Sequence, residues 1–281
     1  LVLVDLWSVD KRYLNDSHFV TRREFSNAFA KRPVDEIILQ DTDPHYRVLD
    51  LSVNTFNDAY VSYHHKTIGG YSPAKLQRYQ DLIERNISTE IRAFSSQMGN
   101  VQTIEDAQNA MVYLPVLSML NTKYIILGAS VPPVENTFRL GNAWFVNEIV
   151  PVNNANEEIE TLKVVNPAFQ AVVSADFIQQ NEALAEEVQR LAAQVNGDNS
   201  LGTDASEAEG AVADMSLNNF IELESYDPNR LVYKYSSNKP QITLFSEVYY
   251  NPGWVATITP AAGGEAQPLD IFRANWILRG A

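Results

Sequence analysis

The sequence predicts a mixed fold of helices and strands, with an N-terminal α/β-type region followed by a C-terminal antiparallel β-sandwich. In the first half, segments with helical spacing of apolar residues alternate with short strand-like segments. Beyond residue 216, strand-like segments follow one another at short spacing, separated by turn residues. Hydrophobic residues make up 45% of the 281 residues and charged residues 20%, so the chain has enough apolar side chains to bury a core.

Three helix starts are expected in the first half. Thr21 with Glu24 forms a capping-box pattern, and Thr103 with Asp106 opens a second helix in a similar way. Ser72-Pro73 combines a hydroxyl N-cap with proline at the first helical position. The apolar residues that follow it at helical spacing are Leu76, Tyr79, Ile83 and Ile87.

Buried strands are expected between and after these helices. Tyr46–Val53 and Lys123–Leu127 have the composition of strands, and Pro115 should end or kink the helix that precedes the second of them. A further strand is expected at Ala168–Val173. Glu182–Val195 has the apolar spacing of an amphipathic helix.

We expect two domains, a mixed α/β domain at residues 1–166 and a β-sandwich domain at residues 167–281. The second includes the amphipathic helix and an acidic insert at residues 197–216, whose small polar residues predict a mobile connection. Five strand segments separated by Pro, Gly and Asn turns are expected after the insert: Phe220–Ser225, Leu231–Tyr235, Gln241–Tyr250, Trp254–Thr259 and Leu269–Leu278.

The N-terminal segment Leu1–Asn15 leaves two interpretations open. It is either a first buried strand or the tail of a transmembrane helix. The longest apolar runs, such as Leu1–Val4 and Tyr124–Leu127, are far too short to cross a bilayer. The segment also has no basic stretch of the kind that begins a signal peptide.

The charge balance excludes some partners. The net charge is −14, and the acidity lies in the second half: residues 1–150 hold 17 acidic and 14 basic side chains, and residues 151–281 hold 18 and 7. Such a surface repels phosphate backbones, so nucleic acid is not an expected partner. The absence of cysteine excludes disulfides, thiol catalysis and cysteine metal sites. No cofactor is expected.

One candidate binding site lies at the expected helix start after Gly69-Gly70. Helix N-termini favour anions, and Tyr71, Ser72, Lys75 and Arg78 could together contact a phosphate-bearing ligand. The alternative is an ordinary capped helix with surface cations. His64 could donate a hydrogen bond near the glycines. A metal site is not expected there, because neighbouring histidines on a strand point to opposite faces and no spacing matches a zinc site.

A second candidate site is aromatic. Tyr249, Tyr250 and Trp254 lie beside a turn, where their rings could stack on a sugar, as could the other tryptophans, Trp276 among them. The alternative is core packing at strand ends. A catalytic pair of carboxylates among residues such as Asp41 and Asp43 needs a geometry that sequence does not provide. We therefore expect no catalytic residue in this chain.

Six short blocks of sequence carry a resemblance to a known family. They are DLWSVDKRYLN (5–15), GYSPAKLQRYQDLI (70–83), LNTKYIIL (120–127), GNAWFV (141–146), FSEVYYNPGW (245–254) and ANWILR (274–279). In this order, over nearly the whole chain, they resemble the extracytoplasmic portion of the YfhO-like family of bacterial multi-pass membrane proteins. The stretch after Trp254 lacks the Asp-Gly turn typical of that family.

The resemblance implies a non-catalytic domain on the extracytoplasmic face of the bacterial cytoplasmic membrane, carried by a polytopic membrane protein similar in layout to glycosyltransferases. Its implied partners are the parent's own transmembrane region, a polyprenyl-phosphate sugar and a cell-envelope glycan. The family's second sheet continues further, so we expect an exposed strand edge where this chain ends. Two alternatives remain: a stand-alone carbohydrate-binding or adhesion module, and a secreted hydrolase.

Overall fold

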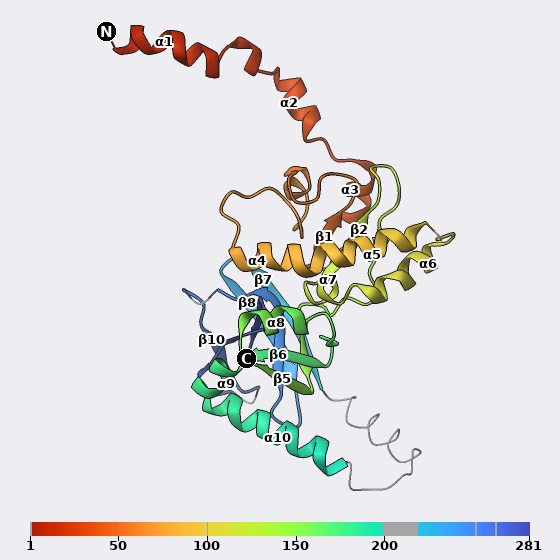
Figure 1. The fold of residues 1–281 in the computed structure, drawn as a ribbon, viewed down its shortest axis with the longest axis vertical. Helices are drawn as coiled ribbons and strands as arrows, with labels where there is room; N and C mark the ends of the chain where they lie inside the picture. Colours follow the sequence, from red (N-terminus) through yellow and green to blue (C-terminus); the bar gives the residue numbers. More distant parts are fainter. Residues whose placement is uncertain (1, 100, 199–218, 251, 262) are drawn as a thin grey trace.

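The computed structural model describes residues 2–99, 101–198, 219–250, 252–261 and 263–281 (Figure 1). The elements of the first half are α1 (Val2–Tyr13), η1 (Asp16–His18), α2 (Arg22–Ala28), α3 (Pro33–Ile38), β1 (Arg47–Asp50), η2 (Tyr60–Tyr63), α4 (Gln77–Leu82), η3 (Ile83–Ile87), α5 (Ser88–Met98), α6 (Ile104–Asn109), η4 (Ala110–Tyr113), α7 (Pro115–Met119), β2 (Thr122–Ile126) and β3 (Val134–Glu135). Those that follow are β4 (Ala143–Val146), β5 (Glu148–Val152), α8 (Ala155–Thr161), β6 (Gln170–Ser174), α9 (Ala175–Gln180), α10 (Glu182–Asp198), β7 (Phe220–Asp227), β8 (Arg230–Ser236), β9 (Ile242–Val248), β10 (Ala256–Ile258), β11 (Gln267–Leu269), β12 (Phe272–Ala274) and β13 (Leu278–Gly280).

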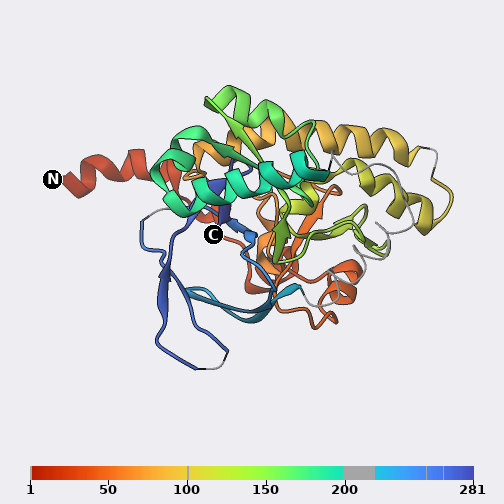
Figure 2. The ribbon, with the colours of Figure 1, turned by 90° about the horizontal axis from the view of Figure 1, so that it is seen from below.

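The N-terminal residues form a helical arm that extends away from the rest of the chain (Figures 1 and 2). α2 begins at the predicted capping box, in which the Glu24 N–H donates to Thr21 Oγ1 over 3.2 Å and the Thr21 N–H donates to Glu24 Oε2 over 2.7 Å. In α1, Val4 is 80% exposed and Trp7 63% exposed. The interpretation of this segment as a buried strand is therefore wrong: it is an exposed helix.

A three-stranded sheet in the order β1-β2-β3 organises the next part of the chain. β1 and β2 are parallel, and β3 pairs antiparallel with β2. The two expected strands are confirmed, although β1 is shorter than predicted. Pro115 occupies the first turn of α7, so the proline ends the preceding helical stretch and begins another. A tight turn then links α7 to β2, with Asn121 in the left-handed region at a φ of 56°.

The predicted helix start at Ser72-Pro73 is wrong. Leu76 is still extended, with a ψ of 132°, and α4 begins at Gln77. Gly69-Gly70 has a packing role instead: a Cβ on Gly69 would lie 1.9 Å from the Thr55 carbonyl oxygen, and Gly70 has a φ of +101°. The glycine pair therefore lets two loops approach closely, and no helix N-terminus follows it directly.

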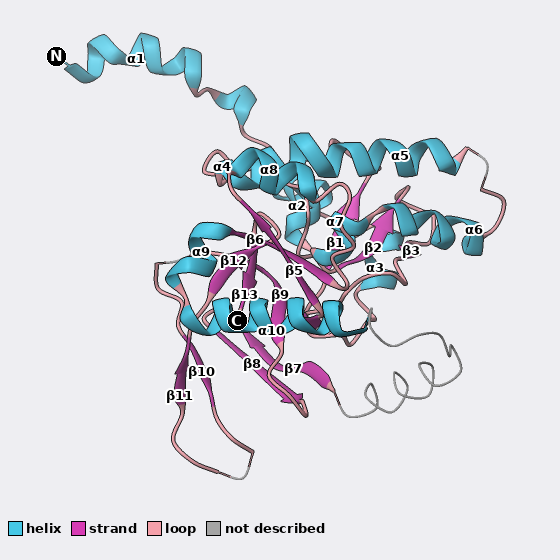
Figure 3. Cartoon of the chain, turned by 60° about the horizontal axis from the view of Figure 1, so that its bottom comes forward, coloured by secondary structure: helices cyan, strands magenta, loops and turns pink. Residues whose placement is uncertain are grey.

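The C-terminal half is built from small sheets, most of them antiparallel. One four-stranded sheet has the order β12-β13-β9-β4, β5 and β6 are parallel, and β7–β8 and β10–β11 are hairpins (Figure 3). Tyr233 of β8 packs on Phe245 of β9 with ring centroids 4.9 Å apart, so the first hairpin lies against the four-stranded sheet. The mixed α and β class with C-terminal antiparallel sheets is thus confirmed, and a closed sandwich stays a prediction.

Strand pairing crosses the expected domain boundary at residue 166. β4 pairs with β9, and β5 pairs with β6. β13, the last strand, is an inner strand between β12 and β9, so the expectation of an exposed edge there is wrong. The acidic insert lies outside the described residues, apart from its first two residues, which end α10.

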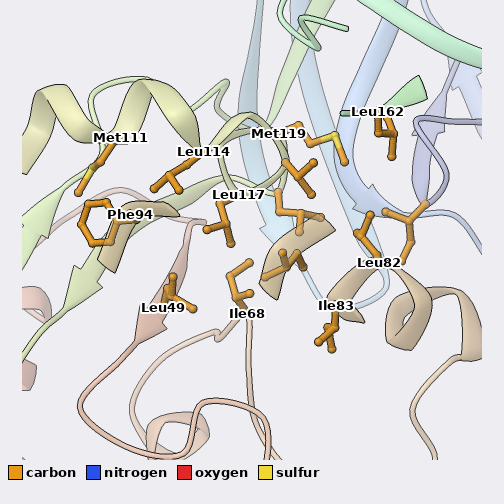
Figure 4. Close-up of a cluster of buried hydrophobic side chains, with 14 of the residues drawn as sticks. Leu49, Ile68, Leu82, Ile83, Phe94, Met111, Leu114, Leu117, Met119 and Leu162 are labelled. Atoms are coloured by element: carbon orange, nitrogen blue, oxygen red, sulfur yellow. The ribbon is translucent and has the colours of Figure 1, made fainter. Parts of the chain in front are cut away.

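The largest core cluster draws on both halves of the chain. Leu49 of β1, Leu82 of α4, Leu117 of α7, Val172 of β6 and Leu278 of β13 are all fully buried members of it. Figure 4 shows part of this cluster, with Leu82 of α4, Phe94 of α5 and Leu117 of α7 among the labelled side chains. The start of α4 is consequently held next to the C-terminal strands, and the candidate site lies between them.

Candidate binding site

A cavity of about 300 Å³ lies between the start of α4 and the C-terminal strands. It is lined by residues from three separate segments: Leu76, Gln77 and Arg78 at the start of α4, Val248, Tyr249 and Tyr250 at the end of β9, and Arg273, Trp276 and Ile277 around the β12–β13 turn. Arg78 and Tyr249 were expected to contact a ligand from separate arguments, and the fold brings both to this one cavity.

The tight turn between β12 and β13 positions Trp276. Asn275 and Trp276 both have a left-handed backbone, with φ of 48° and 69°. Asn275 is held there because its side-chain Oδ1 accepts the Val172 N–H over 2.7 Å while its own N–H donates to the Val172 carbonyl over 2.8 Å. Asparagine tolerates this conformation better than most residues. The turn thereby directs the Trp276 indole toward α4.

Arg78 is fixed to this indole by two contacts. The Trp276 Nε1–H donates to the Arg78 carbonyl over 2.8 Å, and the Arg78 guanidinium lies over the indole ring, 4.3 Å from its centroid. Stacking of this kind leaves the in-plane N–H groups of a guanidinium free to bind an acceptor. Arg78 Nη1 has no hydrogen-bond partner among the described residues.

Glu158 on α8 is the buried counter-charge of the site. Its Oε2 accepts from Arg273 Nη2 at 3.0 Å, and its Oε1 accepts the Trp276 N–H at 3.2 Å. Arg78 Nη1 is farther away, at 3.8 Å from Glu158 Oε2. Two guanidinium groups therefore share this one carboxylate, and Asp81 is a further negative charge near Arg78. Burial lowers the pKa of Arg78, a sign that its charge is poorly solvated.

The opposite wall is aromatic. Tyr249 packs edge-on against Phe177 of α9 with ring centroids 6.1 Å apart, and Tyr250 is 51% exposed. Tyr249 is half-buried. A partly exposed tyrosine can pack its apolar ring against the apolar face of a sugar or a short stretch of lipid. Its hydroxyl group can at the same time form hydrogen bonds with water.

The other predicted site residues lie outside this cavity. Tyr71 and Ser72 are exposed in the loop before α4. Lys75 Nζ donates to Gln80 Oε1 at 3.3 Å and lies 5.8 Å from the Phe56 ring centroid. Trp254 is covered on one face by Arg279, whose guanidinium carbon lies 4.4 Å from the ring centroid. Of the predicted residues, the cavity thus unites Arg78, Tyr249, Tyr250 and Trp276.

His64 follows η2, away from the cavity. Its ring packs edge-on against Tyr60 with centroids 5.3 Å apart, and its Nε2 is buried without a partner among the described residues. The neighbouring His65 instead pairs with the buried Asp35 at 3.0 Å. The two histidines have different partners, and they lie in the turn after η2, so the expectation that they lie on a strand is wrong.

Sequence reasoning missed Arg273 and Glu158. Arg273 lies on a three-residue strand and Glu158 on a seven-residue helix, and neither segment carries a motif. The only local signal was the Trp276 block, three residues after Arg273. Among the described residues, no group of three or more His, Cys, Asp or Glu side chains is arranged to hold a metal ion.

The acids considered for hydrolysis are engaged elsewhere or lie apart. Asp41 and Asp43 both pair with Lys123, at 2.6 and 3.1 Å, and Asp43 also pairs with Arg139 at 2.9 Å. These contacts tie the loop before β1 to β2, as ion pairs in a structural network do. The cavity offers cationic and aromatic groups and one carboxylate that is already bound by arginine, which suits binding of an anion better than acid–base chemistry.

None of the helices in the described part of the chain combines the length and the apolar character that a bilayer crossing requires. In comparisons with known proteins, no family model, no curated protein and no solved structure matches the chain.

Proposed function

We propose that this chain is a non-catalytic ligand-positioning domain on the extracytoplasmic face of a bacterial membrane, carried by a polytopic glycosyltransferase-like protein. Its ligand is an anionic sugar conjugate, such as a polyprenyl-phosphate sugar or a phosphorylated envelope glycan. The sequence blocks that resemble the YfhO-like family motivate the proposal, and the cavity at Arg78 supports its binding part.

One observation carries the binding proposal: Arg78, whose Nη1 has no hydrogen-bond partner among the described residues, lines a cavity that also has two tyrosines and a tryptophan. The guanidinium can donate to a phosphate or carboxylate in a charge-assisted hydrogen bond. The aromatic wall can contact the sugar or the first isoprene unit next to it. The two kinds of contact lie within one cavity, as a phosphate-linked sugar requires.

The N-terminal arm supports attachment to another apolar body. Val2, Val4 and Trp7 in α1 are each more than 60% exposed, and Lys11 Nζ lies 5.4 Å from the Trp7 ring centroid. Tryptophan is enriched at the level of lipid headgroups. In the proposed assembly, this arm meets the parent's own transmembrane region.

Binding of a short-chain polyprenyl-phosphate sugar, measured by isothermal titration calorimetry, tests the proposal. The control ligands are the same sugar without phosphate and the same prenyl phosphate without sugar. We expect the complete conjugate to bind most tightly. Replacing Arg78 by Gln should weaken its binding about tenfold or more, because a charge-assisted hydrogen bond contributes about 1.5–3 kcal/mol.

Arg85→Gln is the matched control variant. Arg85 lies two helical turns further along the same helical stretch, is 50% exposed at its side chain, and pairs with Glu160 at 3.3 Å. Its replacement should leave the affinity unchanged. Equal affinity of Arg78→Gln, Arg85→Gln and the unaltered chain would contradict the proposed site.

The membrane assignment has a separate test, which is the gene sequence on both sides of this segment. We expect many apolar stretches of about twenty residues each, as bilayer spans require. A reading frame with a cleavable signal and no such stretches would refute the membrane part of the proposal. A polyprenyl-phosphate sugar would then no longer be the expected ligand of the cavity.

A carbohydrate-binding module is the second candidate, favoured by the half-exposed Tyr250 at the mouth of the cavity. It differs in the ligand that binds: a neutral glycan should then bind as tightly as its phosphorylated form. Arg78→Gln would have little effect in that case, whereas Tyr250→Ala would abolish binding.

A further inference from the structure

A second group of polar residues, none of which lines the cavity at Arg78, forms a line of three titratable side chains. Lys66 Nζ lies 2.6 Å from His45 Nδ1, and His45 Nε2 lies 2.6 Å from Glu247 Oε1. The three residues come from the loop after η2, the loop before β1, and β9. Their arrangement, an amine on an imidazole on a carboxylate, is that of an activated nucleophile with its base and its orienting acid.

Burial fixes the roles within this line. His45 is 3% exposed and the side chain of Glu247 is 17% exposed, whereas Lys66 is exposed. Glu247 accepts the proton of His45 Nε2, so His45 Nδ1 must carry the lone pair that faces the lysine. The outermost group is therefore the amine, and the inner two can take up and return its proton.

The ring of Tyr226 on β7 completes the surroundings. It stacks on the His45 ring with centroids 4.1 Å apart, and Lys66 Nζ lies 3.3 Å from the Tyr226 centroid. The other charged groups near the amine are Arg47, which approaches Glu247 Oε1 at 3.5 Å, and Asp43. Loss of hydration of the amine beside the ring lowers the pKa of Lys66, although part of the residue is exposed. The charge of Arg47 also lowers this pKa, whereas the charges of Glu247 and Asp43 raise it.

Space for a small molecule lies near this line, in a cavity walled by neighbouring segments of the chain and not by the three residues themselves. A cavity of about 400 Å³ is lined by Asp43 and Pro44, which directly precede His45, by Arg139–Ala143, and by Ile221–Leu223 of the strand that carries Tyr226. Its lining is largely polar. A short polar molecule is thus a better match to it than a lipid chain.

We propose that Lys66 is a nucleophilic amine that captures small polar aldehydes as a Schiff base, with His45 as its proton-transfer partner. This activity is independent of ligand binding at Arg78. His45 Nδ1 takes one proton from the Lys66 ammonium, and the freed amine forms a bond from its nitrogen to the aldehyde carbon.

The remaining steps balance without a further reactant. A proton moves from nitrogen to the former carbonyl oxygen, which gives a neutral carbinolamine. The imidazolium of His45, held by Glu247, then returns its proton to that hydroxyl group, and the C–O bond breaks to release water. The sum is one ammonium and one aldehyde converted to one protonated imine and one water.

Reductive trapping with glycolaldehyde and cyanoborohydride tests the proposal, with peptide mass spectrometry to compare individual lysines. Lys163 is the internal control: it is 42% exposed at its side chain and pairs with Glu160. At pH 7 we expect labelling of Lys66 to be at least about tenfold faster, since proton transfer by a positioned side chain such as His45 typically contributes about 10²–10⁴-fold. Equal rates at Lys66 and Lys163 would overturn the proposal.

Two variants test whether fast labelling comes from proton transfer to His45 or merely from exposure of the Lys66 amine. His45→Gln removes the proton acceptor, and Glu247→Gln keeps the shape of the carboxylate but not its charge. Both should slow labelling of Lys66 toward the rate of Lys163 while Lys163 itself stays unchanged, with circular dichroism confirming the fold. In Glu247→Gln the loss of proton transfer must outweigh the gain in neutral amine, because the Glu247 charge raises the pKa of Lys66. Fast labelling of Lys66 in both folded variants would refute a role for His45 and Glu247. If His45→Gln does not fold, Glu247→Gln alone decides.

Discussion

Glu90 on α5 should make the stability of this protein fall as the pH rises from about 4.5 to about 8. The side chain is buried, and its two carboxyl oxygens accept the N–H groups of Val116 and Leu117 at 2.7 and 3.0 Å, which caps the first turn of α7. Burial raises the pKa of Glu90 from 4.5 to about 8, because loss of solvation disfavours the charge more than the two N–H donors favour it.

The sign follows from proton uptake. Between these two pH values the folded chain holds a proton on Glu90 and the unfolded chain does not, so each step up in pH favours unfolding. At about 1.4 kcal/mol per pH unit, the full interval corresponds to roughly 5 kcal/mol. Local opening of the five-residue α7 would let water reach the charge, so we expect a measured fall of about 2 to 5 kcal/mol.

Urea denaturation of the unaltered chain and of Glu90→Gln, at intervals from pH 5 to pH 9, measures this contribution. The difference between the two chains cancels the titration of all other groups. At pH 5 the variant should be less stable by about 1–3 kcal/mol, because its amide nitrogen faces a buried N–H donor. Near pH 8.5 the difference should vanish or reverse. A difference that stays constant from pH 5 to pH 8 would refute the reasoning.

Two further substitutions test packing and a buried ion pair, each by urea denaturation at pH 7. Gly69→Ala should cost about 3 kcal/mol or more, because the new Cβ would collide with the Thr55 carbonyl oxygen, whereas Gly99→Ala, with no neighbouring atom closer than 3.8 Å, should change the stability little. Asp35→Ala should cost roughly 3–5 kcal/mol, because it removes the buried carboxylate that Arg32, Tyr60 and His65 all bind, and the exposed Glu36→Ala on the same helix is the control. Equal effects within either pair would contradict the corresponding argument.

Local signals in the sequence predicted local structure well. The capping boxes at Thr21 and Thr103 form as expected, since each consists of two side chains three residues apart. Ser72-Pro73 carried an equally good signal and failed. Pro73 and Ala74 are exposed, so a helical turn there would gain no burial to offset its entropy cost.

The prediction of a regular helix with Leu76, Tyr79, Ile83 and Ile87 on one face was also only partly right. Ile83 and Ile87 are buried as the 3.6-residue spacing predicts, but the chain widens into a π-helical turn from Ile83 to Ile87. This extra width also buries Leu82 and Asn86, whose Nδ2 reaches the Ile159 carbonyl at 3.4 Å. Nothing in the local sequence shows such a change of pitch, because it depends on packing against α8.

Long-range pairings account for what sequence reasoning could not see. β4 pairs with β9 about one hundred residues later, and Glu158 meets Arg273 across a similar separation. A single sequence gives the strand character of each segment but not its partner. The binding site depends on these pairings, and so the sequence could supply Arg78 and Tyr249 as separate candidates without their common cavity.

The candidate site and the core share a residue, and this limits how the site can be examined. Trp276 belongs to the main buried cluster, and its N–H is bound by Glu158. Its replacement would weaken the fold and the cavity together, so loss of binding in a Trp276 variant would prove nothing about ligand contact. Arg78 stacks on the outer face of that indole, with 39% of its side chain exposed. A change in binding without a change in stability is therefore interpretable at Arg78, and the rigidity of the Trp276 turn beneath it means that its guanidinium is held in place before any ligand arrives.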